Sequence, residues 1–514
     1  MEKCKKSKSL LEVVLILGIL LFFSLIVITN IFHFNYMMNA DLASDVILSK
    51  LIWTSKEIIP STWYIAAETR IICTPNLAAL FYGVTQNMTL STGLACSFMA
   101  ILVVVGMFYL GRKAGLNWQE SCMFTFLGLA LFTNYIILEL VYLFASYYAI
   151  HVVILFFTLG LYAESIKSKR VRPVGVIISL LFALCLGMQG TRGILVLYGP
   201  LFGIEAIRNI YYIYCKRNNN KPDWIISAWV CMMLVISFLG TSFPLSVEQN
   251  ISRNIRMGIH KLFTIVIPDM YSTLGFSHTN GFGKICLSIL LLIVLYILAD
   301  IVCRMCKKKE IEAVEWAFLV VCSSPIVSAV MVAFTTVESS DRYYFLLFYA
   351  MAFAATLTWR KISDKWCAMK ISGGILIVAF TFMNIHNIYL PILKCEEPPC
   401  SDLNAVGEYL ADNNYLTAYS SFDNANTITV LTNGKVRVAA VASLEKMDIC
   451  EWMSSTLWYV PNVPFEEKTA YVIPEPKIDE FNKFLERHGE EVKFDIQIGS
   501  YLIYVSDYNF SKLE

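Results

Sequence analysis

The chain has 514 residues, of which 57% are hydrophobic and only 16% are charged, and its mean hydropathy is +0.59. A soluble domain carries about 25% charged residues, so this composition excludes an ordinary soluble protein and places most of the chain in a membrane. The 41 basic and 40 acidic residues nearly balance. This balance argues against a nucleic-acid partner, because such proteins carry a basic excess.

The charge is divided unevenly along the chain. Residues 391–514 contain 10 Lys+Arg and 20 Asp+Glu, a net charge of −10, which leaves residues 1–390 at +11. The division predicts two domains: a transmembrane domain at 1–390 with an outer loop at 33–91, and an acidic C-terminal domain at 391–514.

Apolar runs of membrane-spanning length follow one another through the first domain. The first, at 10–32, is long enough for one crossing and lacks a small-x-small cleavage site, so we expect an uncleaved anchor. Ten more runs follow, and we expect a polytopic α-helical protein with about eleven transmembrane helices. These runs lie near 92–111, 120–138, 147–163, 173–190, 193–213, 224–244, 283–303, 313–334, 342–359 and 370–390.

Basic clusters indicate the orientation. If the N-terminus is cytoplasmic and the spans alternate, every cluster falls on the cytoplasmic side, as the positive-inside rule requires. The first loop, the segment at 244–281 and the acidic domain then lie outside. We therefore expect a multi-pass protein of the cell membrane with an extracytoplasmic C-terminal domain. The basic clusters are 112–113, 167–172, 216–217, 304–309 and 360–365.

Two carboxylates open the first outer loop. Asp41 and Asp45 are four residues apart, so a helix beginning near Asn39 places them on one face, where like charges repel. Pairing them brings no stability, which favours a chemical role. The alternative is that Asp41 caps the helix and Asp45 is a solvated residue.

The same loop continues with an aromatic pair and a second group of charges. Trp63 and Tyr64 are typical of the membrane interface and would hold Glu68 and Arg70 at that height. A carboxylate there can deprotonate an acceptor, and an arginine can hold a phosphate.

Three later segments carry candidate phosphate ligands. Arg192, between two apolar runs, is either functional or reaches outward to headgroups. Arg256 belongs to a stripe at helical spacing with Arg253, His260 and Lys261, which either grips a lipid phosphate or rests on headgroups. The third, Arg342, precedes Tyr343 at the start of the tenth span and can pair with a neighbouring carboxylate, and its role as a phosphate ligand rests on a family resemblance alone.

The C-terminal domain is expected to be a small α/β domain. We find no nucleophile–base pair in its sequence, so it either recognises the acceptor, covers the site or is a structural cap. Cys395 and Cys400 form a disulfide or remain thiols. Helices are expected at 402–413 and 476–487, and strands at 416–420, 436–442, 469–473 and 501–505.

Taken together, an Asp soon after the first span, a long interfacial loop, about eleven spans and an outer C-terminal domain resemble the GT-C superfamily of integral-membrane glycosyltransferases. That superfamily includes protein O-mannosyltransferases and aminoarabinose transferases. The loop pattern, with the later segments 422–426 and 432–435 (Phe-Asp-Asn-Ala-Asn and Thr-Asn-Gly-Lys), is similar to a Gram-positive bacterial subgroup of this type.

The resemblance implies transfer of a sugar from a polyprenyl-phosphate donor by an inverting single displacement. Asp41 is then the first candidate base and Asp45 the second. The expected partners are a lipid-linked sugar donor, membrane lipids and an acceptor glycan, lipid or protein, with no cofactor and no required metal. The alternative is a transporter or flippase, or a polymerase or ligase, of lipid-linked saccharides. The substrate- or phosphate-binding candidates are Lys50, Tyr64, Glu68, Arg70, Arg192, Arg256, Arg342 and Tyr343.

Overall fold

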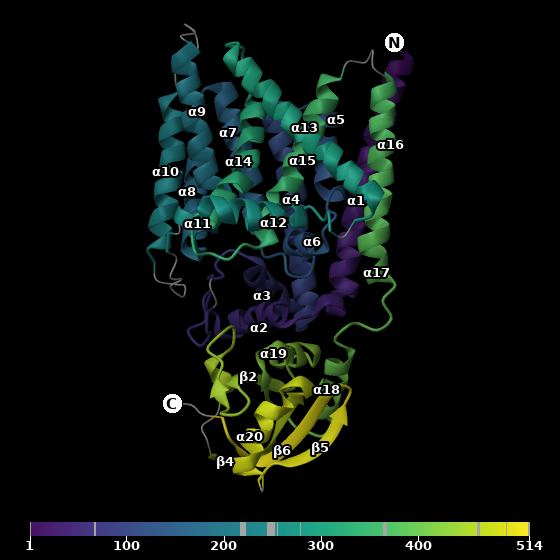
Figure 1. Cartoon of the computed structure of the whole chain (residues 1–514), viewed down its shortest axis with the longest axis vertical. Coiled ribbons are helices and arrows are strands. Elements are labelled where there is room, and N and C mark those ends of the chain that lie inside the picture. The colour runs from purple at the N-terminus through teal and green to yellow at the C-terminus, as the bar shows by residue number, and fades with distance from the viewer. Residues whose placement is uncertain are drawn as a thin grey trace. The chain divides into compact units, whose positions relative to one another are not determined.

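The computed structural model (Figure 1) describes residues 2–65, 68–215, 223–243, 252–253, 255–277, 279–362, 367–459, 463–489 and 491–511. The chain divides into two compact units. The helical unit is built from Met1–Ile26, Phe98–Pro244 and Glu248–Pro391. The mixed unit is built mainly from Val27–Ser97 and Ile392–Glu514. The first loop therefore packs with the C-terminal domain, whereas the sequence assigned it to the transmembrane domain.

The eleven predicted apolar runs all form helices. Within the described residues, eight helices are long and apolar enough to cross a membrane, or up to nine if α5 and α6, bent by 120°, are one span. Two further runs give helices of only 17 and 16 residues, α8 and α15. The helices that lie wholly or partly in the helical unit are α1 (Glu2–Phe32), α4 (Met88–Ala114), α5 (Trp118–Ala130), α6 (Tyr135–Val141), α7 (Ala149–Ser168), α8 (Pro173–Gln189), α9 (Gly199–Cys215), α10 (Trp224–Thr241), α11 (Ile255–Lys261), α12 (Ile267–Thr273), α13 (Gly281–Cys306), α14 (Ala313–Ala333), α15 (Leu346–Lys361), α16 (Cys367–Asn384) and α17 (Leu390–Leu393).

Local signals explain the broken and shortened spans. The Asn134 side chain accepts a hydrogen bond from the Ile136 N–H, which starts α6 as a new helix rather than a continuation of α5. Pro173 begins α8, and Gly190 at φ +136° ends it, so this helix cannot extend in either direction.

Ion pairs gather four of the five basic clusters at one end of the helical unit; the fifth, 216–217, lies outside the described residues. Glu164 Oε1 accepts from Lys113 Nζ at 2.8 Å and from Arg172 Nη2 at 2.7 Å, which joins the first two clusters. Asp300 Oδ2 accepts from Lys361 Nζ at 2.5 Å and from Arg304 Nε at 2.9 Å, which joins two more. Spans that alternate in direction require these clusters to lie at the same end of the helices, as they do.

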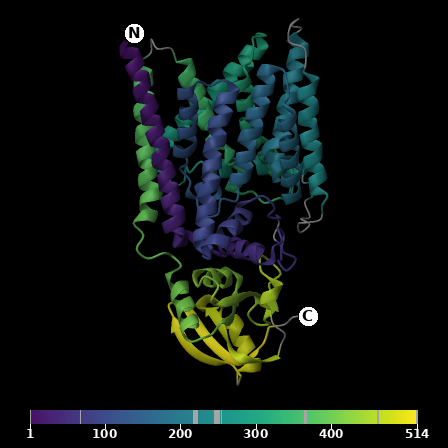
Figure 2. The ribbon, with the colours of Figure 1, turned by 180° about the vertical axis from the view of Figure 1, so that it is seen from behind.

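The opposite ends of the same helices carry Arg192, which follows α8, and Arg342, which precedes α15. In Figure 1, α11 and α12 run crosswise to the long helices. Elsewhere in this unit, α1 and the segment from α16 to α17 lie side by side (Figure 2), with the rings of Phe22 and Tyr389 6.0 Å apart.

The C-terminal part of the mixed unit contains a six-stranded sheet in the order β3-β2-β1-β4-β6-β5. β1 pairs in parallel with β2 and β4, and the remaining pairs are antiparallel. The strands are β1 (Thr417–Ser421), β2 (Arg437–Ser443), β3 (Asp448–Ile449), β4 (Val463–Pro474), β5 (Lys493–Ile498) and β6 (Tyr501–Asn509). The helices of this unit are α2 (Ala40–Ser55), α3 (Thr74–Thr85), α18 (Ser401–Asp412), α19 (Phe422–Leu431) and α20 (Ile478–His488).

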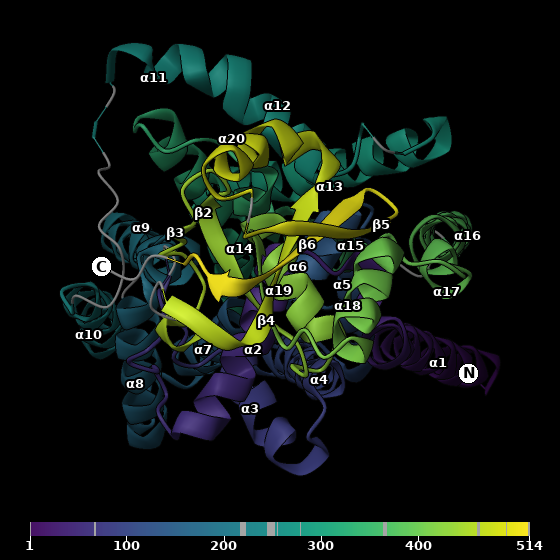
Figure 3. The ribbon, with the colours of Figure 1, turned by 90° about the horizontal axis from the view of Figure 1, so that it is seen from below.

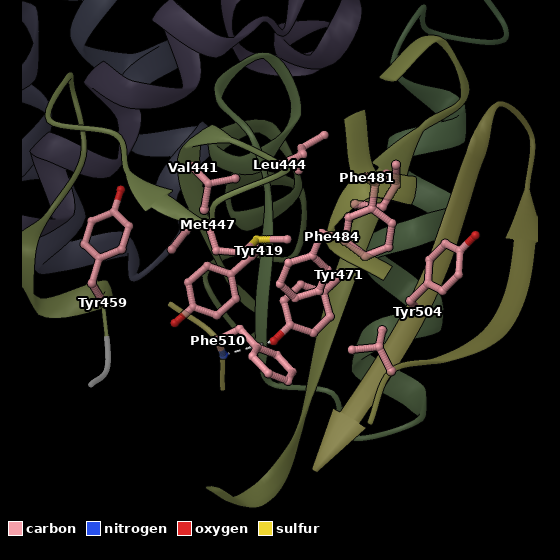
Figure 4. Packing of buried hydrophobic residues seen from close by; sticks show 13 residues of the cluster. Tyr419, Val441, Leu444, Met447, Tyr459, Tyr471, Phe481, Phe484, Tyr504 and Phe510 are labelled. Atoms are coloured by element: carbon pink, nitrogen blue, oxygen red, sulfur yellow. Dashed lines mark hydrogen bonds between the residues drawn. The ribbon is translucent and has the colours of Figure 1, made fainter. Parts of the chain in front are cut away.

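Side chains alternate between the two faces of this sheet, and helices cover both (Figure 3). One face packs Ala418, Val438 and Ala470 against α18 and α19. The other packs Tyr419 and Tyr471 against α20. Figure 4 shows the aromatic rings of the second face, where the Phe510 N–H donates to the Tyr471 hydroxyl at 3.2 Å.

The predicted α/β character of the C-terminal domain is confirmed. Both predicted helices and all four predicted strands are present, as α18, α20, β1, β2, β4 and β6. The sequence missed α19, whose short polar residues resemble a turn, and the strands β3 and β5.

Candidate functional site

The two loop carboxylates lie on α2, at the start of the mixed unit. Asn39 caps this helix, since its side chain accepts from the Leu42 N–H at 2.9 Å. Asp41 lies in the first turn and is exposed, where its charge is favourable near the helix N-terminus. Asp45, one turn later, is only 4% exposed. The alternative expected from the sequence, a cap at Asp41 and a solvated Asp45, is therefore wrong on both counts.

Asp45, Glu68 and Arg70 form a carboxylate–arginine cluster. Arg70 Nε lies 3.4 Å from Asp45 Oδ2, and Arg70 Nη1 lies 3.6 Å from Glu68 Oε2. Burial raises the pKa of Asp45, and the charge and hydrogen bond of Arg70 oppose that rise. The cluster thus holds a carboxylate that binds a proton more tightly than an ordinary aspartate, beside a fixed cation.

Cys73 borders this cluster and was missed in the sequence. It caps α3 and is buried, and its amide donates to Asn76 Oδ1 at 3.2 Å. Burial raises the pKa of its thiol to about 12. The charge of Arg70 lowers this pKa, and the charge of Asp45 raises it. Cys73 is therefore an uncharged thiol beside the cluster and not a nucleophile.

The C-terminal domain binds the first loop through the segments 422–426, which contacts α2, and 432–435, which contacts the junction of α3 and α4. Asn426 is fully buried, and its Nδ2 donates to Ser44 Oγ at 2.7 Å. Asn433 Oδ1 accepts from the Met88 N–H at 2.9 Å, and Asn433 Nδ2 donates to the Gln86 carbonyl at 3.2 Å. The two segments that carried the resemblance to a Gram-positive subgroup in the sequence therefore join the loop to the domain.

Lys50 and Tyr64 lie apart from the carboxylates. Lys50 lines a cavity, and its ammonium contacts Gly434 at the turn after α19. Tyr64 packs against the aromatic core on the α20 face, and its N–H donates to the Ser454 carbonyl at 2.9 Å. Of the loop candidates, the structure therefore brings together Asp45, Glu68 and Arg70, with Asp41 one turn away.

The helical unit carries the remaining candidates. The Arg192 guanidinium lies over the Tyr148 ring, 4.0 Å from its centroid, and that ring packs against Phe345 at 5.2 Å. Arg342 is exposed, with its guanidinium 5.7 Å from the Tyr343 ring centroid. Arg192 and the segment carrying Arg342 are thus linked through Tyr148 and Phe345.

The expected basic stripe does not form one helix face. Arg253 precedes α11 and pairs in an extended conformation with Thr335. Lys261 Nζ donates to the carbonyls of Val332 and Thr335 at 2.7 and 3.0 Å, where α14 ends and its carbonyls lack helical partners. Arg256 lies within α11, and its side chain is outside the described residues.

Two questions about cysteines and metals have structural answers. Cys395 and Cys400 are free thiols, and Cys400 donates to the Asn35 carbonyl at 3.2 Å. Within the described ranges, no group of three or more His, Cys, Asp or Glu side chains could hold a metal ion.

These features define a polytopic α-helical membrane protein whose first loop packs with a C-terminal α/β domain. No protein-family model and no curated protein matches the sequence. The fold is nevertheless that of GT-C proteins. It is similar to ArnT from Cupriavidus metallidurans in the apo state, with a TM-score of 0.59, 9% identity, and coverage of 95% of this chain and 97% of that one.

Two further solved structures share the fold. ArnT from the same organism bound to undecaprenyl phosphate gives a TM-score of 0.56 at 10% identity and covers 97% of this chain and 99% of that one. The Archaeoglobus fulgidus oligosaccharyltransferase in complex with Zn and sulfate gives a TM-score of 0.53 at 10% identity. The match covers 97% of this chain and 73% of that one. The predicted GT-C resemblance is confirmed at the level of the fold.

Proposed function

We propose that this chain is a membrane glycosyltransferase of the GT-C type that moves a sugar from a polyprenyl-phosphate donor to an acceptor hydroxyl at the outer face of the cell membrane. The observation that carries the proposal is the likeness in fold to ArnT over almost the whole length of both chains. ArnT has also been crystallised with undecaprenyl phosphate, which supports a lipid-linked donor.

Asp41 is the proposed base. An acceptor hydroxyl has too high a pKa to attack unaided, so a carboxylate must take its proton as the new bond forms. Asp41 is exposed and can reach such a hydroxyl, whereas Asp45 is buried beside Arg70. Asp45 is the second candidate, with its carboxylate oriented by that arginine. A single displacement inverts the configuration at the sugar.

Arginines are proposed to hold the donor phosphate. Charge develops on the phosphate as the sugar leaves, and fixed cations stabilise it in a site where water is scarce. Arg70 is the candidate within the mixed unit, and Arg192 and Arg342 are the alternative candidates within the helical unit. The gathering of the basic clusters at one end of the helical unit supports a cytoplasmic N-terminus and an extracytoplasmic C-terminal domain.

The test is transfer of label from polyprenyl-phosphate sugars by the purified full chain. Asp41→Asn is expected to lower the turnover rate by about 10²–10⁴-fold, the usual contribution of a general base. Asp412→Asn, an exposed aspartate at the end of α18, is the matched control and should leave turnover unchanged. Wild-type turnover by a folded Asp41→Asn variant would sink the assignment of the base.

The same assay separates an enzyme from a transporter. Movement of the labelled lipid across reconstituted vesicles, without hydrolysis or transfer of the sugar, would contradict the proposal and favour a flippase. Addition of the sugar to a growing chain of the same repeat would favour a polymerase.

A further inference from the structure

The mixed unit contains a cavity of about 220 Å³ whose walls come from the first loop and the C-terminal domain. Lys50 and Thr54 of α2 line one side, and Arg437 at the start of β2 and Trp458 line the other. Pockets that take drug-sized ligands have volumes of about 300–1,000 Å³, so this cavity suits one sugar ring rather than a chain.

The cavity is cationic. None of its lining residues is acidic. In the part of the chain that the structure describes, neither Lys50 nor Arg437 makes an ion pair. Arg437 Nη2 donates to Thr417 Oγ1 at 3.3 Å, and its buried Nε has no hydrogen-bond partner there. The two cations that line the cavity have no acidic neighbour in it, so the cavity favours an acceptor of hydrogen bonds that carries negative charge.

The backbone lies close to one of these cations. Gly434 follows Asn433, and both residues have positive φ, at +74° and +53°. A Cβ atom at Gly434 would collide with the Lys50 ammonium. The glycine therefore allows the turn and at the same time leaves room for the ammonium against the chain.

The remaining lining is typical of a sugar site. Trp458 is half-buried and offers a flat apolar surface, and Thr54 and Ser455 bring hydroxyl groups to the walls. An apolar ring face, hydroxyls and two cations complement a sugar that carries an acidic substituent. Neither an uncharged sugar nor a bare anion uses all three.

We propose that this cavity binds the anionic sugar unit of the acceptor, a monosaccharide bearing a carboxylate or a phosphate. Lys50 and Arg437 would pair with the acidic group, and Trp458 would cover one face of the ring. The role as acceptor subsite rests on the glycosyltransferase function proposed above, whereas binding itself does not.

The test is binding of small-molecule probes to the purified full chain, measured by ligand-observed NMR and calorimetry. Glucuronic acid or glucose 6-phosphate should bind at least about tenfold more tightly than glucose, because charge-assisted hydrogen bonds contribute about 1.5–3 kcal/mol. Lys50→Gln and Arg437→Gln should each weaken binding by a similar factor. Lys435→Gln, an exposed neighbour, is the matched control and should not change it.

Equal affinity for glucose and the acidic sugars, or unchanged binding in both variants, would overturn the proposal. It would also fall if inorganic phosphate bound as tightly as glucose 6-phosphate, or if a short polyprenyl phosphate competed for the cavity as the donor would. Binding is measured again in Asp41→Asn. Loss of transfer with binding retained leaves this inference standing, and absence of binding in a chain that transfers sugar refutes this inference alone.

Discussion

Replacing Arg70 with Gln should destabilise the chain through Asp45. The two side chains are 19% and 5% exposed and their charges are 3.4 Å apart. At an effective dielectric constant of about 20 their attraction is about 5 kcal/mol before the cost of desolvation. Removing one partner of a buried pair costs about 3–5 kcal/mol, because the other charge is left unpaired. We expect Arg70→Gln to lower the free energy of unfolding by about 3 kcal/mol.

The double variant Arg70→Gln/Asp45→Asn isolates the cause. A neutral amide at position 45 removes the stranded charge, so the double variant should recover most of the lost stability. The loss in Arg70→Gln should also grow with pH. Burial raises the pKa of Asp45, and a raised carboxyl pKa means stability that is present at low pH and lost as the group ionises.

Unfolding of the detergent-purified full chain by heat and by denaturant at about pH 5 and about pH 8 measures both effects. Lys435→Gln, exposed in the same unit, controls for loss of a positive charge alone. A double variant no more stable than Arg70→Gln, or a loss that is larger at the lower pH, would refute the reasoning.

Three further outcomes follow from the site. The pH profile separates the two candidate bases: because burial raises the pKa of Asp45, an acid limb set by Asp45 would lie above pH 3.8 and move higher in Arg70→Gln, whereas an unmoved limb would show that Asp45 does not titrate in the reaction and would leave Asp41 as the base. Gly434→Ala should lower the free energy of unfolding by about 1–2 kcal/mol, the cost of a left-handed alanine, and should weaken acidic-sugar binding through Lys50; normal stability and binding would contradict it. A chelator should leave transfer unchanged, because Arg70 supplies the positive charge beside the carboxylates; recovery of a lost rate by added Mg²⁺ or Mn²⁺ would contradict this.

The membrane helices could be predicted because spanning depends on local composition. Each apolar run in the sequence became a helix, and the deviations arise at single residues such as Asn134 and Gly190 that end or restart a helix. Four strands of the C-terminal domain could also be predicted, because each is a short local segment rich in residues that favour strands. β3 has only two residues and leaves no pattern, whereas β5 alternates polar and apolar residues (Lys-Phe-Asp-Ile-Gln-Ile) and could have been predicted from that alternation.

The candidate site was only partly predictable, since its environment comes from residues far away in sequence. The spacing of Asp41 and Asp45 gave their shared helix but not their different burial. Ser44 and Asn426, which join α2 to α19, are 382 positions apart. Arg437 had no signal of its own in the sequence, and Cys73 was one thiol among 15.

One helix links the two proposals. α2 carries Asp45 near its start and Lys50 five residues later, and burial shifts the pKa of both groups toward the neutral form, upward for Asp45 and downward for Lys50. α2 packs against α19 of the C-terminal domain, so the domain helps to create the surroundings in which both groups titrate. Weakening this contact with Asn426→Ala should therefore lower the pKa of Asp45 and raise that of Lys50 together. A purely structural cap would change stability without moving either titration.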